Sequence, residues 1–215
     1  MVWHKEVNMA VHYRTRGFIL KKEDRGEFDR VFTVFTKDFG KLQLRAISER
    51  KSASKLRGGL ELFYISEVEF IEGRNQKTLV DAVAEKQHLY LRGDLKRVRI
   101  MFRLAEIFDQ VLQGEEGDEK TWKLVSDTAA FLDQERLDAK DLKLIFYYFL
   151  WNVLALHGYG PELATISQKY PELGNTLHLF LEEEAEALHK IPFGCIHEGL
   201  LNKVSQIYLS RVLEK

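Results

Sequence analysis

The sequence RVFTVFTKDFGKLQLRAISERKSASKLR, residues 30–57, decides how the first half of this chain folds. It opens on β-branched and aromatic residues up to Thr36, a composition typical of a strand. Lys37-Asp38-Phe39-Gly40 then has the chemistry of a hairpin turn. Beyond the turn, apolar and polar residues alternate from Lys41 to Ile47, before the serine-containing loop Ser48–Ser54. The stretch therefore predicts a β-hairpin that runs into an irregular basic loop.

The same period of two extends outward on both sides of this hairpin. His12–Leu20 has it and runs into the charged stretch Lys21–Gly26, which we expect to be a turn. Strands with turns every 8–12 residues are typical of a small antiparallel barrel, and a five-stranded oligonucleotide-binding (OB) fold fits best. The expected strands are His12–Leu20, Phe28–Thr36, Leu42–Ile47, Leu60–Ile71 and Thr78–Val83.

From His88 onward, apolar residues recur every three or four positions, which indicates helices. The segment Asp141–Leu156 is apolar nearly all round and should be surrounded by the other helices. We therefore predict an α+β chain, with an OB-fold domain over residues 1–83 and an all-helical domain over 84–215. The expected helices are 91–112, 122–132, Asp141–Leu156, Thr176–Lys190 and Glu198–Leu213.

Composition excludes several classes of protein. Cys195 is the single cysteine, so neither an internal disulfide nor a cysteine-based zinc finger is expected. The start carries no apolar signal segment, and the most hydrophobic run, Leu144–Leu156, is shorter than the roughly 20 residues that span a bilayer. We expect a cytoplasmic protein with no membrane partner.

Charge is unevenly distributed along the chain. The net charge is −1, but residues 1–80 hold sixteen Lys or Arg against eleven Asp or Glu, giving +5, which leaves −6 for residues 81–215. Within residues 30–57, eight basic residues face two acidic ones, giving +6. Such a concentration is the electrostatic signature of a surface that meets a phosphate backbone.

Nucleic-acid binding is therefore favoured over the alternative that these cations form an ordinary solvated face of a sheet. Phe32 and Phe35 point to opposite faces of one strand, so at most one of them could stack on a base. Five phosphate contacts to a single strand would give a slope of log K against log salt of roughly −3.5. Candidate phosphate contacts are Lys37, Lys41, Arg45, Arg50, Lys51, Lys55 and Arg57, with Arg30 in the same segment and Arg14, Arg16, Lys21 and Lys22 on a neighbouring strand.

Signals for catalysis are weak. No glycine spacing fits a phosphate-binding loop. His178 and Glu182 stand at i, i+4 without a third metal ligand, and Cys195 is better read as a small buried residue than as a nucleophile. We expect no enzyme and no cofactor or metal. The open alternatives are an RNA-binding barrel with a helical interaction domain and a protein adaptor whose basic strip meets an acidic partner.

Several motifs, in this order and spacing, resemble the RecO family of bacterial recombination mediators. The resemblance is strong over the first 80 residues and looser in the helical half. The motifs are Tyr13–Leu20, Glu27–Arg30, Phe35–Leu42, Arg50-Lys51-Ser52 with Ser54–Gly58, and Gly158–Leu163.

The resemblance implies an N-terminal OB fold, a helical domain and a non-enzymatic role in DNA repair and recombination in the cytoplasm, associated with the nucleoid. It implies binding of single- and double-stranded DNA, annealing of complementary strands and help in loading RecA. The implied partners are RecR and the single-stranded-DNA-binding protein (SSB), whose acidic, apolar C-terminal tail docks in the helical domain. RecA is an indirect partner. Cations that could receive the tail's carboxylate are Arg97, Arg99, Arg103 and Lys143.

The chain departs from this family in two places. Many members carry a four-cysteine zinc site in the region that corresponds to residues 158–196, where this chain has only Cys195. We therefore expect this region to be held by packing of Tyr159, Leu163, Tyr170, Leu173 and Phe193. Second, the loop segment Ile47-Ser48-Glu49 is less basic than the family usually has, which would lower its contribution to DNA affinity.

Overall fold

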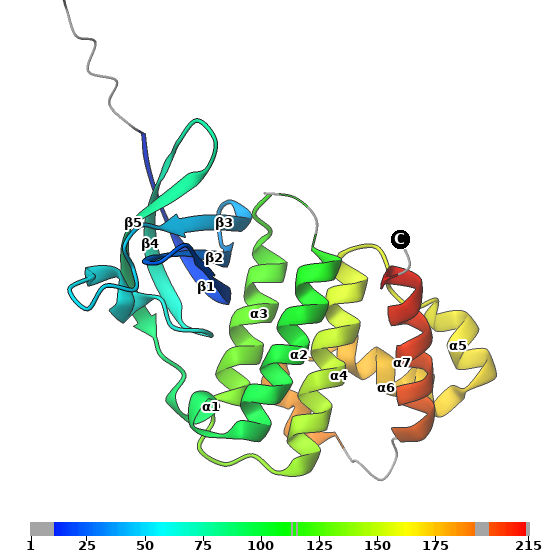
Figure 1. The fold of residues 1–215 in the computed structure, drawn as a ribbon. Helices are drawn as coiled ribbons and strands as arrows, with labels where there is room; N and C mark the ends of the chain where they lie inside the picture. The colour runs from blue at the N-terminus through cyan, green and yellow to red at the C-terminus, as the bar shows by residue number, and fades with distance from the viewer. Residues whose placement is uncertain (1–10, 113, 115, 192–197, 214–215) are drawn as a thin grey trace, which may run out of the picture. The chain divides into compact units, whose positions relative to one another are not determined.

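The structure is a computed structural model that describes residues 11–112, 114, 116–191 and 198–213 (Figure 1). Contacts divide the chain into two compact units. One contains the barrel, ends at Gln87 and also takes in Glu116 and Gly117; the other begins at His88 and contains the helices. Both are described separately below.

The first unit is a closed five-stranded barrel, as the period of two predicted. Its strands are β1 (His12–Arg25), β2 (Asp29–Thr36), β3 (Gly40–Ala46), β4 (Ile65–Glu72) and β5 (Lys77–Lys86). They follow each other around the barrel in the order β1-β2-β3-β5-β4. The β3–β5 pair is parallel and the other pairs are antiparallel. One parallel pair is needed to close the predicted five-stranded barrel, because an odd number of strands in a ring cannot alternate direction throughout.

Alternate residues of every strand fill the barrel. On β3 the predicted inward residues Leu42, Leu44 and Ala46 are all buried. At one end of the barrel the ring of Phe39 meets the rings of Tyr13 and Phe70 edge-on, at 5.6 and 5.5 Å between centroids. The core consists of Ile19, Phe32, Val34, Leu42, Leu44, Ala46, Leu60, Tyr64, Val68, Phe70, Leu79 and Ala82.

Two stretches of the barrel differ from the sequence prediction. The charged run from Lys21 was expected to be a turn, but β1 continues through it to Arg25 and turns only at Gly26, with φ of +66°. Here the ion pairs Lys21–Glu23 and Asp24–Arg30 replace apolar alternation, because both faces of this two-stranded ribbon meet solvent. Residues 60–64 were expected to begin a strand, but they turn at Phe63, with φ of +67°, before β4 starts. The periodicity of the sequence also did not predict the short 3-10 helix η1 (Lys55–Gly59).

In the helical unit, α4 is the most enclosed helix, as its uniform apolar composition predicted. Helices α2, α3 and α6 pack against it (Figure 1). No helix in the part of the chain that the structure describes is long and apolar enough to cross a membrane. The helices are α1 (Leu89–Gly93), α2 (Leu95–Val111), α3 (Glu119–Leu132), α4 (Ala139–Leu156), α5 (Leu163–Lys169), α6 (Pro171–Glu182), η2 (Ala185–Lys190) and α7 (Glu198–Leu213).

Helix boundaries follow local capping chemistry that periodicity does not detect. The expected helix 91–112 is interrupted at Asp94, whose side chain accepts hydrogen bonds from the N–H groups of Lys96 and Arg97 and so begins α2. The expected helix Thr176–Lys190 is likewise two elements, α6 and η2. The end of α4 is as predicted, with Gly158 in the left-handed region at φ of +81°.

The segment after α4 is packed mainly through residues that the sequence reasoning did not name. Of those it did name, Leu173 is buried, and Tyr159, Leu163 and Tyr170 are half-buried. Phe193 and Cys195 lie outside the described residues. The buried hydrophobic residues of this segment are Ile166, Leu173, Leu177, Phe180, Ala185, Leu188 and Ile191.

Candidate nucleic-acid interface

The predicted phosphate contacts fall on three parts of the barrel unit. Lys37 lies in the turn between β2 and β3, and Lys41 and Arg45 lie on the outward side of β3. Arg50 and Lys51 belong to the loop that follows β3. Lys55 and Arg57 belong to η1, which packs against β5. The structure thus distributes the basic segment over several edges of the barrel.

The loop after β3 is fastened to the start of β2. The N–H of Arg50 donates to the carbonyl of Phe28 at 3.0 Å, and the N–H of Ser48 donates to Oδ1 of Asp29 at 2.8 Å. Arg45 donates to Oδ2 of the same carboxylate at 2.6 Å. These donors hold the pKa of Asp29 below its usual value, with the Ser48 N–H as the largest cause. The loop therefore keeps a defined position at the end of the barrel.

Most arginines of the candidate set are already paired with carboxylates. Arg14 lies 2.7 Å from Glu69 and 3.5 Å from Glu67, and Arg16 lies 2.9 Å from Glu85. The pairs Lys21–Glu23 and Lys22–Glu61 complete this set, at 2.5 and 3.0 Å. Most of these acids lie on β4, β5 or the segment before β4, about 40–70 positions along the chain, so counting charge within one segment could not find them. The neighbouring-strand candidates are therefore largely neutralised.

A second network joins the β1–β2 turn to the loop after β3. Nε of Arg30 donates to Asp24 at 2.7 Å, and its Nη1 donates to Glu49 at 3.1 Å. Glu49 is 3% exposed, so this acid serves as an internal partner of Arg30. Arg50 reaches the other oxygen of Asp24 at 3.3 Å. We call Asp24, Phe28, Arg30, Arg50 and Lys51 the loop cluster.

Four of the predicted cations form no ion pair with a carboxylate among the described residues: Lys37, Lys51, Lys55 and Arg57. Lys51 nevertheless lies near enough to Asp29 to help lower the pKa of that carboxyl. Lys51, Lys55 and Arg57 are exposed, and Lys37 is half-buried. Lys51 belongs to the loop cluster, whereas Lys37 lies in the turn between β2 and β3 and Lys55 and Arg57 lie on η1. These are the positive charges that the barrel offers to an outside anion.

The structure changes the expectation about aromatic stacking. Phe32 and Phe35 are both 0% exposed, so neither can serve as the stacking platform that one of them was allowed to be. Phe28, which sequence reasoning treated only as the first residue of a strand, is 42% exposed instead. The ammonium of Lys51 lies 5.0 Å from the centre of its ring. Phe28 follows the charged turn at Gly26 and precedes the buried part of β2. This position in the sequence could have indicated that its ring is exposed.

In the helical unit, the candidate Arg97 has a structural role. It is 7% exposed, and its guanidinium donates to the carbonyls of Leu132, Gln134 and Glu135 at 3.1, 2.5 and 3.3 Å. Leu132 is the last residue of α3, and Gln134 and Glu135 lie in the turn that follows it, so Arg97 ties the end of α3 to α2. Arg97 is therefore not available to a partner's carboxylate. It was named as a candidate because the sequence does not reveal which face of α2 it occupies.

The other three candidates on these helices are exposed. The guanidinium of Arg103 lies 4.5 Å from the ring centre of Phe146, and Nζ of Lys143 lies 2.8 Å from Glu198. Arg99 lies on the exposed side of α2. The structure does not bring these three together around one cavity.

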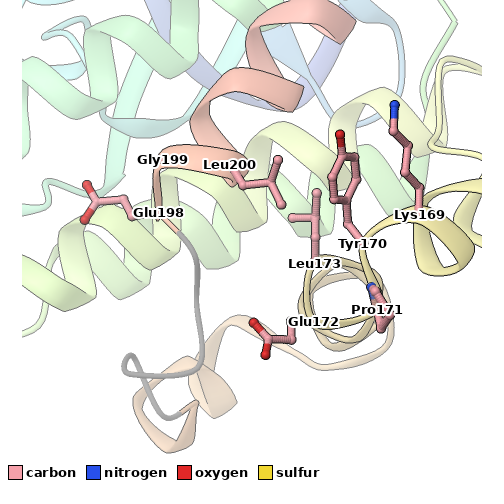
Figure 2. Close-up of a pocket in the computed structure, with 8 residues that line it drawn as sticks. All are labelled: Lys169, Tyr170, Pro171, Glu172, Leu173, Glu198, Gly199 and Leu200. Atoms are coloured by element: carbon pink, nitrogen blue, oxygen red, sulfur yellow. The ribbon is translucent and has the colours of Figure 1, made fainter.

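A groove of about 770 Å³ opens between α6 and the start of α7. Figure 2 shows Leu200 and Leu173 pointing toward each other in its middle, with the amino group of Lys169 at one end and Glu198 at the other. The groove is thus apolar in the middle and charged at its ends. Lys169, the one cation among its lining residues, was not among the predicted binding residues. The lining residues are Lys169, Tyr170, Pro171, Glu172, Leu173, Glu198, Gly199 and Leu200.

The described residues offer no set of metal ligands. No three His, Cys, Asp or Glu side chains among them are grouped to hold an ion. His178 and Glu182 form an exposed ion pair at 3.0 Å on α6. The single cysteine of the sequence, Cys195, lies outside the described residues.

Comparison with known proteins points to one family. The model of the family described as "Recombination protein O N terminal" matches residues 9–87. The chain is similar to the DNA repair protein RecO of Dehalococcoides mccartyi, with 30% identity over 171 residues, which cover 80% of this chain and 66% of the relative. Similarity to the protein of the same name from Trichodesmium erythraeum is 24% over 212 residues, covering 94% of this chain and 74% of the relative. With the Roseiflexus protein of that name, identity is 30% over 151 residues, covering 70% of this chain and 52% of the relative.

Proposed function

The chain belongs to the RecO family, and from this premise we propose that it is a non-catalytic mediator of DNA repair and recombination. In this proposal the barrel binds the backbones of single- and double-stranded DNA and anneals complementary strands. The observation that carries the proposal is the set of cations on the barrel unit that form no ion pair with a carboxylate among the described residues, Lys37, Lys51, Lys55 and Arg57, together with the exposed ring of Phe28, which lies 5.0 Å from the ammonium of Lys51.

The arrangement favours recognition of the backbone over recognition of base sequence. Lysines on a turn, a loop and η1 can follow successive phosphates, while one exposed aromatic ring can stack on any base. Arg45 and Arg50 remain secondary candidates, because Asp29 and Asp24 already hold them. Lys41, which lies on β3 like Arg45, is a further candidate.

Annealing of this kind needs no chemical step. Two DNA strands repel each other, and a cationic surface that holds both lowers this repulsion and makes pairing effectively intramolecular. The acidic balance of residues 81–215, −6, gives the helical part no comparable attraction for DNA. The strands are therefore expected on the barrel.

The proposed protein partners are RecR and the C-terminal tail of the single-stranded-DNA-binding protein, with RecA reached indirectly. An acidic tail that ends in apolar residues suits a groove with an apolar middle and a cation at one end. The groove at Leu173 and Leu200 is our candidate for the tail, with the tail's carboxylate at Lys169, away from Glu198 at the other end of the groove. Arg99, Arg103 and Lys143 remain candidates for contacts elsewhere on the tail or for RecR.

The proposal is tested by reversing two of the unpaired charges. We expect Lys51→Glu with Lys55→Glu to weaken binding to the same extent on unrelated sequences, and to flatten the salt slope for single-stranded DNA by about 1.4, at roughly 0.7 per lost contact. Fluorescence anisotropy across a salt series measures both. The control is Lys120→Glu with Lys203→Glu, which makes the same change in net charge at exposed positions of the helical unit.

Three outcomes would contradict the proposal. A loss confined to one DNA sequence would contradict backbone recognition. Tighter binding to single-stranded RNA than to DNA, without annealing, would favour the RNA-binding alternative. Absence of any salt-dependent DNA binding by the folded protein would favour a protein adaptor.

A further inference from the structure

The side chain of Asp24 bridges two arginines on the surface of the barrel. Asp24 lies directly opposite Arg30 in the β1–β2 pair, and its Oδ1 accepts from Nε of Arg30 at 2.7 Å. Its Oδ2 lies 3.3 Å from Nη1 of Arg50, in the loop after β3. The side chain is nevertheless 52% exposed, so one face of this carboxylate is open to solvent.

Two guanidinium groups around one anion are also what a phosphate-binding site requires. Guanidinium forks bind carboxylates and phosphates with the same geometry. The cations around Asp24 keep its pKa below the usual value, with Arg30 as the largest cause and Arg50 and Lys22 adding to it. The Asp24 side chain therefore stays charged at the near-neutral pH at which nucleic acid would be bound. The ring of Phe28 and the ammonium of Lys51 belong to the same loop cluster, so a backbone held by them would bring phosphates to this position.

The two acids that hold Arg30 differ in how easily they can leave. Glu49 is 3% exposed and fixes Nη1 of Arg30 from inside at 3.1 Å. Asp24 is on the surface and can turn toward water without disturbing the core. Arg30 would thus stay in place when Asp24 leaves, with its Nε freed for another anion.

We propose that Asp24 acts as an internal competitor for a backbone phosphate, which binds Arg30 and Arg50 by displacing the Asp24 carboxylate. This inference rests on the proposed DNA binding and names one phosphate subsite of that surface. The competition keeps binding weak at this subsite and helps a strand to leave, because the carboxylate is tethered beside the arginines at high effective concentration. Release after pairing is what a protein that anneals strands repeatedly requires.

Asp24→Asn tests the inference, because the amide keeps the shape of the side chain and removes its charge. We expect about two- to fivefold tighter binding of a single-stranded oligonucleotide at fixed low salt, the size of an exposed ion pair. The matched control is Glu23→Gln, which removes the same charge from the adjacent residue, whose partner is Lys21 at 2.5 Å. In an Arg50→Ala background, the gain from Asp24→Asn should shrink, because one of the two arginines is gone. Asp24→Ala serves as a second variant, and thermal unfolding verifies that each protein is folded.

The possible results distinguish failure of the Asp24 inference from failure of the proposed DNA binding. An equal gain from Glu23→Gln would reduce the effect to net charge, and weaker binding of Asp24→Asn would mean that Asp24 positions the arginines; both overturn the inference alone. If neither the wild-type protein nor Asp24→Asn binds DNA at low salt, the proposed function fails and the inference fails with it. A gain specific to Asp24→Asn that depends on Arg50 supports both.

Discussion

At the scale of single residues, the charge of this barrel depends on which arginines already have a partner. The segment 30–57 carries +6, but Arg30, Arg45 and Arg50 all lie within 3.3 Å of carboxylates. Two of these carboxylates, Asp24 and Asp29, precede the segment and were outside that count. For the proposed DNA binding, lysines without an ion pair are therefore better candidates for phosphate contacts than the local sum of charges suggests.

Phe28 is expected to stack on a base. Phe28→Ala should weaken binding of single-stranded DNA by about 1–3 kcal/mol, and duplex binding should change less because its bases remain stacked on each other. Phe28→Tyr, which keeps the ring, should bind like the wild type. Anisotropy titrations with matched single- and double-stranded oligonucleotides provide the comparison. Equal losses on both forms of DNA would instead assign Phe28 to positioning Lys51.

Arg97 is expected to stabilise the helical unit. Arg97→Ala removes a donor from three carbonyls, at the end of α3 and in the turn that follows, and should lower the free energy of unfolding by on the order of 2–4 kcal/mol. Arg99→Ala, at an exposed position two residues along the same helix, should change it by less than about 0.5 kcal/mol. Urea denaturation followed by circular dichroism measures both. If Arg97→Ala were as stable as Arg99→Ala, the structural role given to Arg97 would be incorrect.

At the scale of elements, periodicity predicted the barrel strands and the central helix because burial imposes the same pattern on sequence and structure. It failed where hydrogen bonds and ion pairs decide. The charged end of β1 carries no apolar alternation, and the split at Asp94 depends on a cap. The loop cluster was only partly predictable, since the basic loop is visible in the sequence while Asp24 and Phe28 join it only through the fold.

Docking of η1 against β5 depends on Gly59. A Cβ at Gly59 would lie 2.3 Å from the carbonyl oxygen of Ala82, whereas a Cβ at Gly58 would meet nothing within 4 Å. Gly59→Ala should therefore destabilise the barrel by about 1–3 kcal/mol and weaken DNA binding by displacing Lys55 and Arg57. Gly58→Ala is the adjacent control and should leave both properties close to wild type. Thermal melts and anisotropy test this, and equal behaviour of the two variants would contradict it.

Acid should loosen the attachment of the loop after β3. The pKa of Asp29 is lowered in the folded protein, so its contribution to stability is complete above its unfolded value of about 3.9 and is lost as pH falls through the folded pKa. Asp29→Asn should be less stable than the wild type at pH 7, and this difference should shrink below about pH 4. Chemical denaturation at a series of pH values measures it, with Glu27→Gln as an exposed control. A difference that stays constant with pH would contradict the role given to Asp29.

At the scale of the whole molecule, charge divides the two functions that we propose. The sequence is +5 through residue 80 and −6 beyond it, and the two compact units meet near that point in the chain, at Gln87 and His88. A basic barrel can hold DNA while an acidic helical unit, with its groove at Leu173 and Leu200, remains open to a protein partner. We propose that this separation lets one chain hold DNA and a partner at once.

Strand annealing tests the central claim most directly. Two complementary oligonucleotides, one with a fluorophore and one with a quencher, are mixed with and without the full chain across a salt series. Our account predicts that the protein accelerates quenching at low salt, that the acceleration fades as salt rises, and that Lys51→Glu with Lys55→Glu removes most of it. No acceleration at low salt by the folded protein would contradict the account.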